Sequence, residues 1–377
     1  MRKRIDEMEI MRGLAIIAIV LLHVTAYFMG SPGSHLAYKV SFFFNQVTRF
    51  ALPLFMVMSG WALAYNAKPE EDIDYAVFIK KRVKNILTPY LVWSVVYFIF
   101  YLTYIHKVPL GGGKLEDVAL FAQQPWQLIP IFLKNLLFGW NYVHLYFIIL
   151  IFQFYLIFPL IIGPIRRVKS PLRFLTVASV LYILLMIYLF YFRVLTGNLA
   201  LDIFVRYYAG MLISWYVYFL IGILIGMHFQ AFNDFANKHS LKMIALYVLT
   251  TVLVLVEAWS TSPGDIPKLT SLRVTVFLNT LVSIFFYFRV SQLLKGRKLG
   301  YKLVQITGRH SFTIYFVHLM LLVLLNNQLL RLSDQFSLQR TLYLPVLFIV
   351  TWFASLLFAH LEQLAKGLLR KQNSLGR

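Results

Sequence analysis

Cysteine is absent from this chain of 377 residues. A protein without cysteine forms no disulfide, binds no metal through a thiolate and forms no cysteine acyl-enzyme. Acidic residues are scarce too, with 15 Asp and Glu against 36 Lys and Arg, and 14% of the residues are charged. The positive excess suggests nucleic acid, but the basic residues punctuate apolar runs and form no compact basic domain. We therefore expect no nucleic-acid partner.

The sequence also lacks the patterns that are typical of metal sites, nucleotide hydrolysis and signal peptides. The nine histidines show no pair four residues apart and no carboxylate at ligand spacing, so we expect no metal site and no permanently bound cofactor. A glycine-rich phosphate loop is also missing, and nucleotide hydrolysis is not indicated. The first apolar run lacks the small-residue cleavage site of a signal peptide, so we expect it to stay as a membrane span.

What the chain has in abundance is apolar sequence. Hydrophobic residues make up 60% of it, and the mean hydropathy is +0.71, whereas soluble domains contain about 45–50% apolar residues. The apolar runs are about twenty residues long, which is typical of transmembrane helices and too long for barrel strands. The sequence predicts an all-α integral membrane protein, a bundle of about ten transmembrane helices. The predicted spans are residues 11–29, 46–65, 86–105, 144–164, 173–192, 208–228, 241–259, 272–292, 310–330 and 342–364.

Alternate connections between these spans are strongly basic. They hold most of the 36 Lys and Arg residues, for example in residues 80–84, 166–173 and 295–309. By the positive-inside rule these connections face the cytosol. Both termini are then cytosolic, as an even number of spans requires. We expect a multi-pass protein of the cell membrane with a single domain over residues 1–377. The long external connection, 106–143, contains an apolar stretch, Trp126 to Trp140, for which a re-entrant and an interfacial position both stay open.

Arg12 and His23 lie on the first predicted span. At about 100° and about 1.5 Å per residue they share one helix face, with His23 roughly 16 Å beyond Arg12. Ionisable side chains inside a membrane are costly and usually face a cavity or a pathway. We therefore expect Arg12 at the inner mouth, His23 near the middle of the bilayer, and an anionic ligand that enters from the cytosol.

Two other spans carry polar side chains at a depth similar to that of His23. On the second predicted span, Ser59 is either a catalytic residue or a small residue that lets two helices approach. On the ninth, Tyr315 and His318 share one stripe with Ser311. A buried histidine is commonly a hydrogen-bonded structural residue, but two histidines at one depth favour a functional site.

The segment 74–87 is predicted to form an interfacial amphipathic helix. Its lysines gather on one face, where anionic headgroups explain them. Arg82 instead projects into the middle of the apolar face, so we expect it to point into the protein, where a guanidinium suits a phosphate. Pro89 and Tyr90 follow at the start of the third span.

His144 opens the fourth span at its outer end. Its ring either contacts an acceptor that arrives from outside or is solvated at the interface, where the neighbouring Tyr146 and Phe147 act as aromatic anchors. Glu257, near the outer end of the seventh span, is expected to be an interfacial carboxylate.

In this order and at these spacings, the residues resemble the acyltransferase-3 family of polytopic membrane acyltransferases over nearly the whole chain. The strongest match is the first-helix signature of an arginine, ten residues and a histidine, here Arg12 and His23. Supporting matches are Phe55 to Gly60, the basic run ending in Pro89 and Tyr90, His144 to Phe147, and Ser311 through Tyr315 to His318. One position departs from the family: its second arginine, three residues after the one matched by Arg82, is replaced here by Asn85.

The resemblance implies an enzyme that moves an acyl group, with acetyl expected, from cytosolic acyl-CoA to a hydroxyl of a cell-envelope or surface glycan or its lipid-linked precursor. His23 is expected to be the general base, because an imidazole takes and returns a proton near neutral pH. Ser59 and His318 are expected to polarise the thioester carbonyl or to orient His23. The substrate-binding residues are expected to be Arg12, Arg82, Tyr90, His144 and Tyr315.

The expected partners follow from that reaction. They are acyl-CoA, the glycan or lipid-linked sugar, membrane lipids and, if the chain passes its acyl group on, a separate extracytoplasmic transferase. Two other functions stay open. One is export of a polysaccharide or flipping of a lipid-linked sugar, which Asn85 makes harder to exclude. The other is proton-coupled transport, because a histidine within the membrane can relay protons.

Overall fold

The computed structural model describes residues 5–29, 36–67, 73–104, 125–192, 197–261, 270–295, 298–332 and 340–375. Every regular element in these ranges is a helix. In them, nine helices are long and apolar enough to cross a membrane, and a tenth crossing is reached if one bent pair counts as a span. The predicted helical bundle is confirmed, whereas the cytosolic termini and the single domain stay predictions.

The chain divides into two compact units. Unit 1 comprises Met1–Met58 and His228–Arg377, and unit 2 comprises Ser59–Met227, so that the division falls inside α3 (Ala51–Asn66). The other helices of unit 1 are α1 (Asp6–Phe28), α2 (Leu36–Val47), α12 (Phe229–Lys238), α13 (Ser240–Thr261), α14 (Val274–Leu294), α15 (Lys298–Arg309), α16 (Ser311–Leu332) and α18 (Arg340–Leu375). The other main helices of unit 2 are α4 (Tyr75–Arg82), α5 (Thr88–Thr103), α7 (Leu128–Phe138), α8 (Tyr146–Arg166), α9 (Pro171–Ile187), α10 (Leu199–Tyr207) and α11 (Tyr216–Met227).

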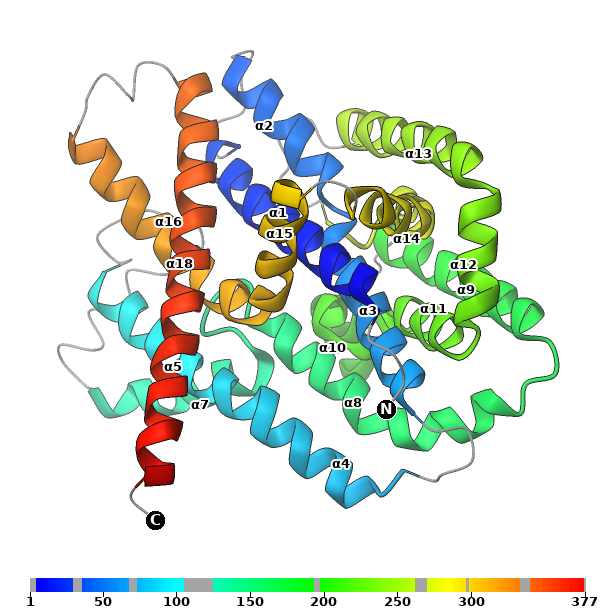
Figure 1. Cartoon of the computed structure of the whole chain (residues 1–377), viewed down its shortest axis with the longest axis horizontal. Coiled ribbons are helices and arrows are strands. Elements are labelled where there is room, and N and C mark those ends of the chain that lie inside the picture. The colour runs from blue at the N-terminus through cyan, green and yellow to red at the C-terminus, as the bar shows by residue number, and fades with distance from the viewer. Residues whose placement is uncertain are drawn as a thin grey trace. The chain divides into compact units, whose positions relative to one another are not determined.

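Helix α1 forms the centre of unit 1. It packs against α2, α14, α15, α16 and α18, as Figure 1 shows for the dark blue helix. Its closest neighbour is α15, because a Cβ at Gly308 would clash with the carbonyl oxygen of Glu9 and a Cβ at Gly13 would clash with that of Val304. Glycine at both crossing points lets the two backbones touch, which brings Arg12 beside the end of α15.

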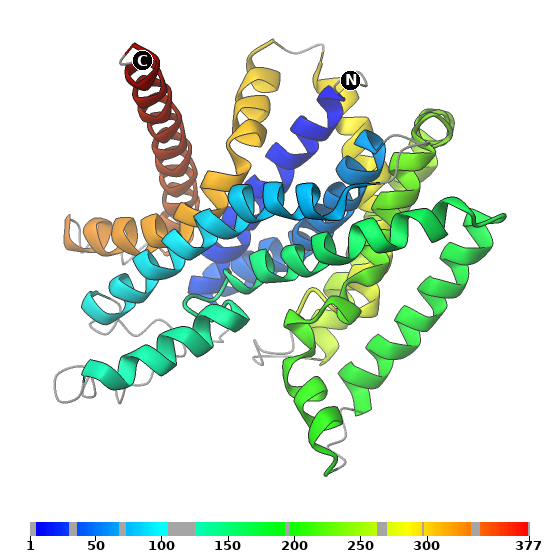
Figure 2. The same ribbon diagram turned by 90° about the horizontal axis from the view of Figure 1, so that it is seen from below.

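Unit 2 contains two long spans that follow one another, α8 and α9, which diverge from their connecting turn (Figure 2). Before them, α4, a π-helix at Val83–Leu87 and α5 run on as one apolar helix. The segment 74–87, predicted as a separate interfacial helix, therefore continues into the third span. Helix α7 lies within the connection 106–143, of which residues 106–124 are outside the described ranges.

Two other predicted spans differ from the structure. The second begins at Leu36 instead of residue 46, because polar side chains of α2 that interrupt the apolar pattern are buried inside unit 1. The sixth was predicted as residues 208–228. Its helix is shorter, Tyr216–Met227, and a separate helix, α12, follows from Phe229.

Candidate active site

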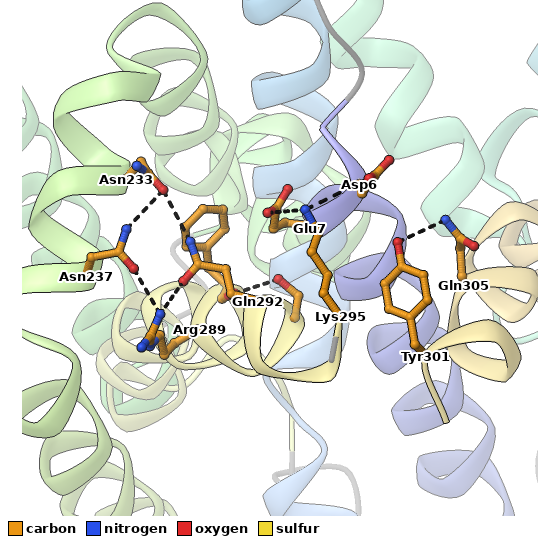
Figure 3. A network of polar contacts seen from close by, with 11 residues as sticks. Asp6, Glu7, Asn233, Asn237, Arg289, Gln292, Lys295, Tyr301 and Gln305 are labelled. Carbon is orange, nitrogen blue, oxygen red and sulfur yellow. Dashed lines mark hydrogen bonds and ion pairs between the residues drawn. The ribbon is translucent and has the colours of Figure 1, made fainter. Parts of the chain in front are cut away.

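The polar start of α1 is tied to the end of α14. Lys295 Nζ lies 2.6 Å from Glu7 Oε1 and 3.9 Å from Asp6 Oδ2 (Figure 3). Partial burial lowers the pKa of Lys295, but the hydrogen bond and negative charge of Glu7, with the charge of Asp6, more than offset this, so the pKa is raised. The lysine therefore stays charged and fixes the end of α1 that leads to Arg12.

A second network holds α14 to α12 at the same end of unit 1. Arg289 Nη1 donates to Oδ1 of Asn237 at 3.1 Å and to Oε1 of Gln292 at 2.9 Å. Gln292 Nε2 in turn donates to Oδ1 of Asn233 at 3.3 Å (Figure 3). These hydrogen bonds hold α12 against α14, which is one of the helices that pack around α1.

Two histidines meet inside unit 1. The ring centroids of His23 on α1 and His318 on α16 lie 5.2 Å apart. His318 is fully buried and His23 is half-buried. Nδ1 of His318 lies 2.9 Å from the carbonyl oxygen of Ile314. Because a carbonyl only accepts, Nδ1 carries the proton, and Nε2 of the neutral ring keeps its lone pair.

Tyr315 and Ser311 extend this site along α16. The ring centroid of Tyr315 lies 6.0 Å from that of His318, and both Tyr315 and Ser311 are buried. The predicted stripe of three residues on one face of the ninth span thus ends at the histidine pair.

A cavity of about 980 Å³ lies where α1, α15, α16 and α18 meet. Both Arg12 and Ser311 line it. At about 1.5 Å per residue, His318 lies roughly 10 Å along α16 from Ser311, and His23 lies roughly 16 Å along α1 from Arg12. Two helices therefore lead from this cavity to the two histidines.

The cavity carries a mixed set of charges. Arg12, Arg309 and Lys366 line it together with Glu9 and Glu362. Arg309 Nε lies 3.3 Å from Glu9 Oε2, and Lys366 Nζ lies 2.7 Å from Glu362 Oε1. With three cations and two carboxylates, the cavity favours an anionic ligand.

Two imidazoles also face this cavity. The rings of His310 and His360 both line the cavity, with centroids 5.9 Å apart. Burial lowers the pKa of His310, and the positive charge that His360 can carry lowers it further.

Sequence reasoning missed a polar cluster next to His23. Asn45 Nδ2 on α2 donates to the carbonyl oxygen of Leu22 at 3.0 Å and to Oγ1 of Thr25 at 3.2 Å. Arg49 Nη2 donates to Oδ1 of Asn45 at 2.5 Å. Through Asn45, the Arg49 guanidinium is thereby fixed to the same turn of α1. The available signal was an Asn four residues before an Arg within an apolar stretch.

This cluster continues into a buried ion pair. Arg273 Nη2 donates to Oε1 of Gln46 at 2.6 Å, and Arg273 Nη1 lies 3.4 Å from Glu257 Oε2. Thr275 also donates to Glu257. The Glu257 side chain is 11% exposed and that of Arg273 is fully buried, so the carboxylate is paired with a cation inside unit 1, while its place at the membrane interface stays a prediction.

Arg82 lies in unit 2 between two aromatic rings. Its guanidinium carbon lies 4.8 Å from the ring centroid of Phe78 and 5.1 Å from that of Tyr155 on α8. Arg82 is half-buried, whereas Lys81 and Lys84 are exposed. The side chain therefore turns away from the lysine face, and cation–π contacts hold it against α8.

Tyr90 and His144 are buried in unit 2. The Tyr90 hydroxyl donates to the carbonyl oxygen of Leu136 on α7. The ring of His144 lies 5.1 Å from that of Tyr97 and 5.7 Å from that of Tyr142. His144 is therefore enclosed by aromatic rings, and the alternative of a solvated histidine is excluded.

Ser59 is half-buried at the start of unit 2. At its neighbour Gly60, a Cβ would clash with the backbone of Phe219, so α3 and α11 touch there. One of the two predictions for Ser59 was that small residues here let two helices approach, and this contact between helices is present. Of the predicted site residues, unit 1 thus joins His23, His318 and Tyr315 directly, and a cavity lies beside Arg12; the others lie in unit 2.

Comparisons with known proteins identify a family and several relatives of this chain. The family model of the acyltransferase-3 family, described as an acyltransferase domain, matches residues 5–360. A Bacillus subtilis protein named as a membrane-bound acyltransferase, YfiQ, is 24% identical over 324 residues, which cover 84% of this chain and 80% of the relative. A Staphylococcus aureus protein (strain MRSA252) named as a probable poly-beta-1,6-N-acetyl-D-glucosamine export protein is 25% identical over 310 residues, or 81% of this chain and 77% of the relative. No solved structure matches the chain.

Proposed function

The chain belongs to the acyltransferase-3 family, and we propose that it moves an acyl group, with acetyl expected, from cytosolic acyl-CoA to a hydroxyl of a cell-envelope or surface glycan or its lipid-linked precursor. Family membership makes the protein an acyltransferase, and its apolar helices make it a multi-pass membrane protein. The observation that carries the proposal is the contact between His23 and His318, 5.2 Å apart inside the bundle.

The proposed reaction needs one base and one returned proton. His23 takes the proton of the acceptor hydroxyl, and the oxygen attacks the carbonyl carbon of the thioester. As the new C–O bond forms, the C–S bond breaks, and the departing sulfur of CoA takes the proton from His23. His318 orients His23, and Ser59 stays a predicted catalytic residue. A variant of this route passes the acyl group through His23 itself before the acceptor takes it.

The cavity beside Arg12 supports a donor that is anionic at one end. Its cations suit phosphate groups, and about 980 Å³ lies at the upper end of the range of about 300–1,000 Å³ for small-molecule sites. The rise of roughly 16 Å from Arg12 to His23 is a distance that a flexible arm with a terminal thioester must bridge. Arg82, Tyr90, His144 and Tyr315 stay predicted substrate-binding residues.

Acyl transfer by the purified full chain in detergent tests this function. We expect acetyl-CoA to be consumed and the glycan to gain one acetyl group per CoA released, as measured by mass spectrometry. The variant His23→Ala is expected to abolish transfer while it still inserts and folds, and His239→Ala serves as the matched control elsewhere in unit 1. Full activity of His23→Ala would refute His23 as the base.

Export is the second candidate function, because relatives at 25% identity are named as polysaccharide export proteins. An exporter would show no acyl transfer in detergent, where no gradient exists. It would also gain no thermal stability from CoA, whereas an acyl-CoA enzyme at 100 times its Kd gains about 2.7 kcal/mol. An unchanged Tm with CoA and no turnover together would favour export.

A further inference from the structure

Unit 2 contains a cavity of about 660 Å³ that plays no part in the proposed reaction. Helices α8, α9 and α11 supply most of its wall. The lining residues are Phe154, Ile157, Leu160, Ile161, Pro164, Ile165, Phe174, Val177, Ala178, Leu181, Leu185, Ile213, Tyr216, Phe219 and Leu220. We call it the α8–α9 crevice.

The crevice exists because both neighbouring spans pack on α11. Helix α9 contacts α11, and the Tyr216 hydroxyl donates to the carbonyl oxygen of Ala178 at 2.7 Å. Helix α8 contacts α11 through the rings of Phe154 and Phe219, whose centroids lie 4.6 Å apart. The two helices diverge from their turn (Figure 2), and Pro164 within α8 favours a bend there.

The wall of the crevice is suited to a hydrocarbon chain. Tyr216 is its one polar side chain, and its hydroxyl is already bonded to Ala178. A sugar in this space would lose its hydrogen bonds to water without replacing them. Rim residues such as Leu160 and Leu181 are 65% and 58% exposed, so in a bilayer the crevice opens toward lipid tails.

The turn between α8 and α9 is basic, in contrast to the apolar wall of the crevice. Arg166, Arg167, Lys169 and Arg173 lie within four residues of crevice residues Pro164, Ile165 or Phe174. The sequence from residue 118 to residue 201 contains no Asp or Glu, so no nearby carboxylate along the chain offsets these charges. Basic pockets between membrane helices on the cytosolic side bind anionic lipid headgroups.

We propose that the α8–α9 crevice binds an anionic phospholipid, with an acyl chain between α8 and α9 and the phosphate at the basic turn. The positive-inside rule alone explains basic residues at a cytosolic turn, but it does not explain an apolar crevice that ends beside them. This site does not depend on the acyl-transfer reaction, because none of its residues belongs to the histidine pair or to the cavity beside Arg12.

Native mass spectrometry of the full chain in detergent tests the site, with phosphatidylglycerol and phosphatidylcholine as probes. We expect one phosphatidylglycerol to bind more tightly than phosphatidylcholine. The triple variant Arg167→Gln, Lys169→Gln and Arg173→Gln changes three exposed positions. Each cation near a lipid surface strengthens the binding of an anionic lipid about five-fold, so the loss of three is expected to weaken binding about 100-fold. Equal binding of the two lipids by the wild type would overturn the proposal without any variant.

A pair of tryptophan variants on α9 tests the crevice itself. Val177 lines it and is 54% exposed, whereas Val180 is 49% exposed and does not line it. Val177→Trp is expected to fill the crevice and to displace the bound lipid, and Val180→Trp to retain it. Lipid retention by Val177→Trp, or equal loss in both variants, would show that the lipid binds elsewhere.

Discussion

His318 donates from Nδ1 to the carbonyl of Ile314, and this contact fixes which ring atom can act on a proton. In His318→Gln the side-chain amide still offers a donor but no longer a basic nitrogen. We expect turnover of acetyl-CoA to fall by about 10²–10⁴-fold, the usual contribution of a positioned acid or base, with little change in Tm. The matched control is His239→Gln. Unchanged turnover in His318→Gln would leave His318 with a packing role only.

His310 makes the stability of the protein depend on pH. Burial and the neighbouring His360 lower its pKa in the folded chain, so below pH about 6.5 the unfolded chain binds a proton more readily than the folded one. Stability is therefore complete above that pH and is lost as the pH falls through it. We expect the decrease in Tm between pH 7.5 and pH 5.5 to be smaller in His310→Gln than in the wild type. An identical decrease in both would contradict this.

How far single residues could be predicted depended on where their partners lie. His23 and His318 could be paired because helix geometry gives the depth of each residue from its own span. Arg273 gave no such signal. Arg273 is bonded to Gln46, which is 227 residues away in the chain, and no local pattern identifies that partner.

Among the elements, the spans were predicted well and their ends poorly. Asn45 and Gln46 interrupt the apolar pattern of α2, yet both are buried against other helices. Hydropathy therefore places the start of this span too late. Hydropathy gives no signal for the end of α11 at Met227 or for the π-helix at Val83–Leu87.

The crossing of α1 and α15 depends on a missing side chain at Gly308. A Cβ there would clash with the carbonyl oxygen of Glu9, whereas a Cβ at Gly300 of the same helix meets nothing within 4 Å. Forcing extra atoms into a packed contact costs about 1–3 kcal/mol. We expect Gly308→Ala to lower Tm in detergent and to raise the KM for acyl-CoA, because Arg12 moves with α1.

Gly300→Ala is the matched control for this crossing, since alanine favours a helix over glycine by up to about 1 kcal/mol. We expect its Tm to stay the same or to rise slightly. A loss of stability in Gly300→Ala equal to that in Gly308→Ala would mean that glycine content, and not the contact with α1, matters in α15.

On the scale of the whole molecule, each of the two units combines apolar and basic residues in the same way. Each unit contains an apolar interior and a cavity with basic residues beside it: Arg12 and Lys366 in unit 1, and Arg167 and Lys169 at the turn next to the crevice in unit 2. The positive-inside rule assigns all four residues to the cytosolic side. The orientation in the membrane therefore decides whether cytosolic acyl-CoA can reach Arg12.

The absence of cysteine allows this orientation to be measured without background. A single cysteine at Val143, which is 62% exposed and precedes α8, is predicted to face outward. One at Lys169, in the turn after α8, is predicted to face the cytosol because of its basic surroundings. In intact cells we expect a membrane-impermeant maleimide to label Val143→Cys and not Lys169→Cys, and to label both after permeabilisation. The reverse pattern would place Arg12 on the outer side, where cytosolic acyl-CoA cannot enter, and would exclude the proposed donor.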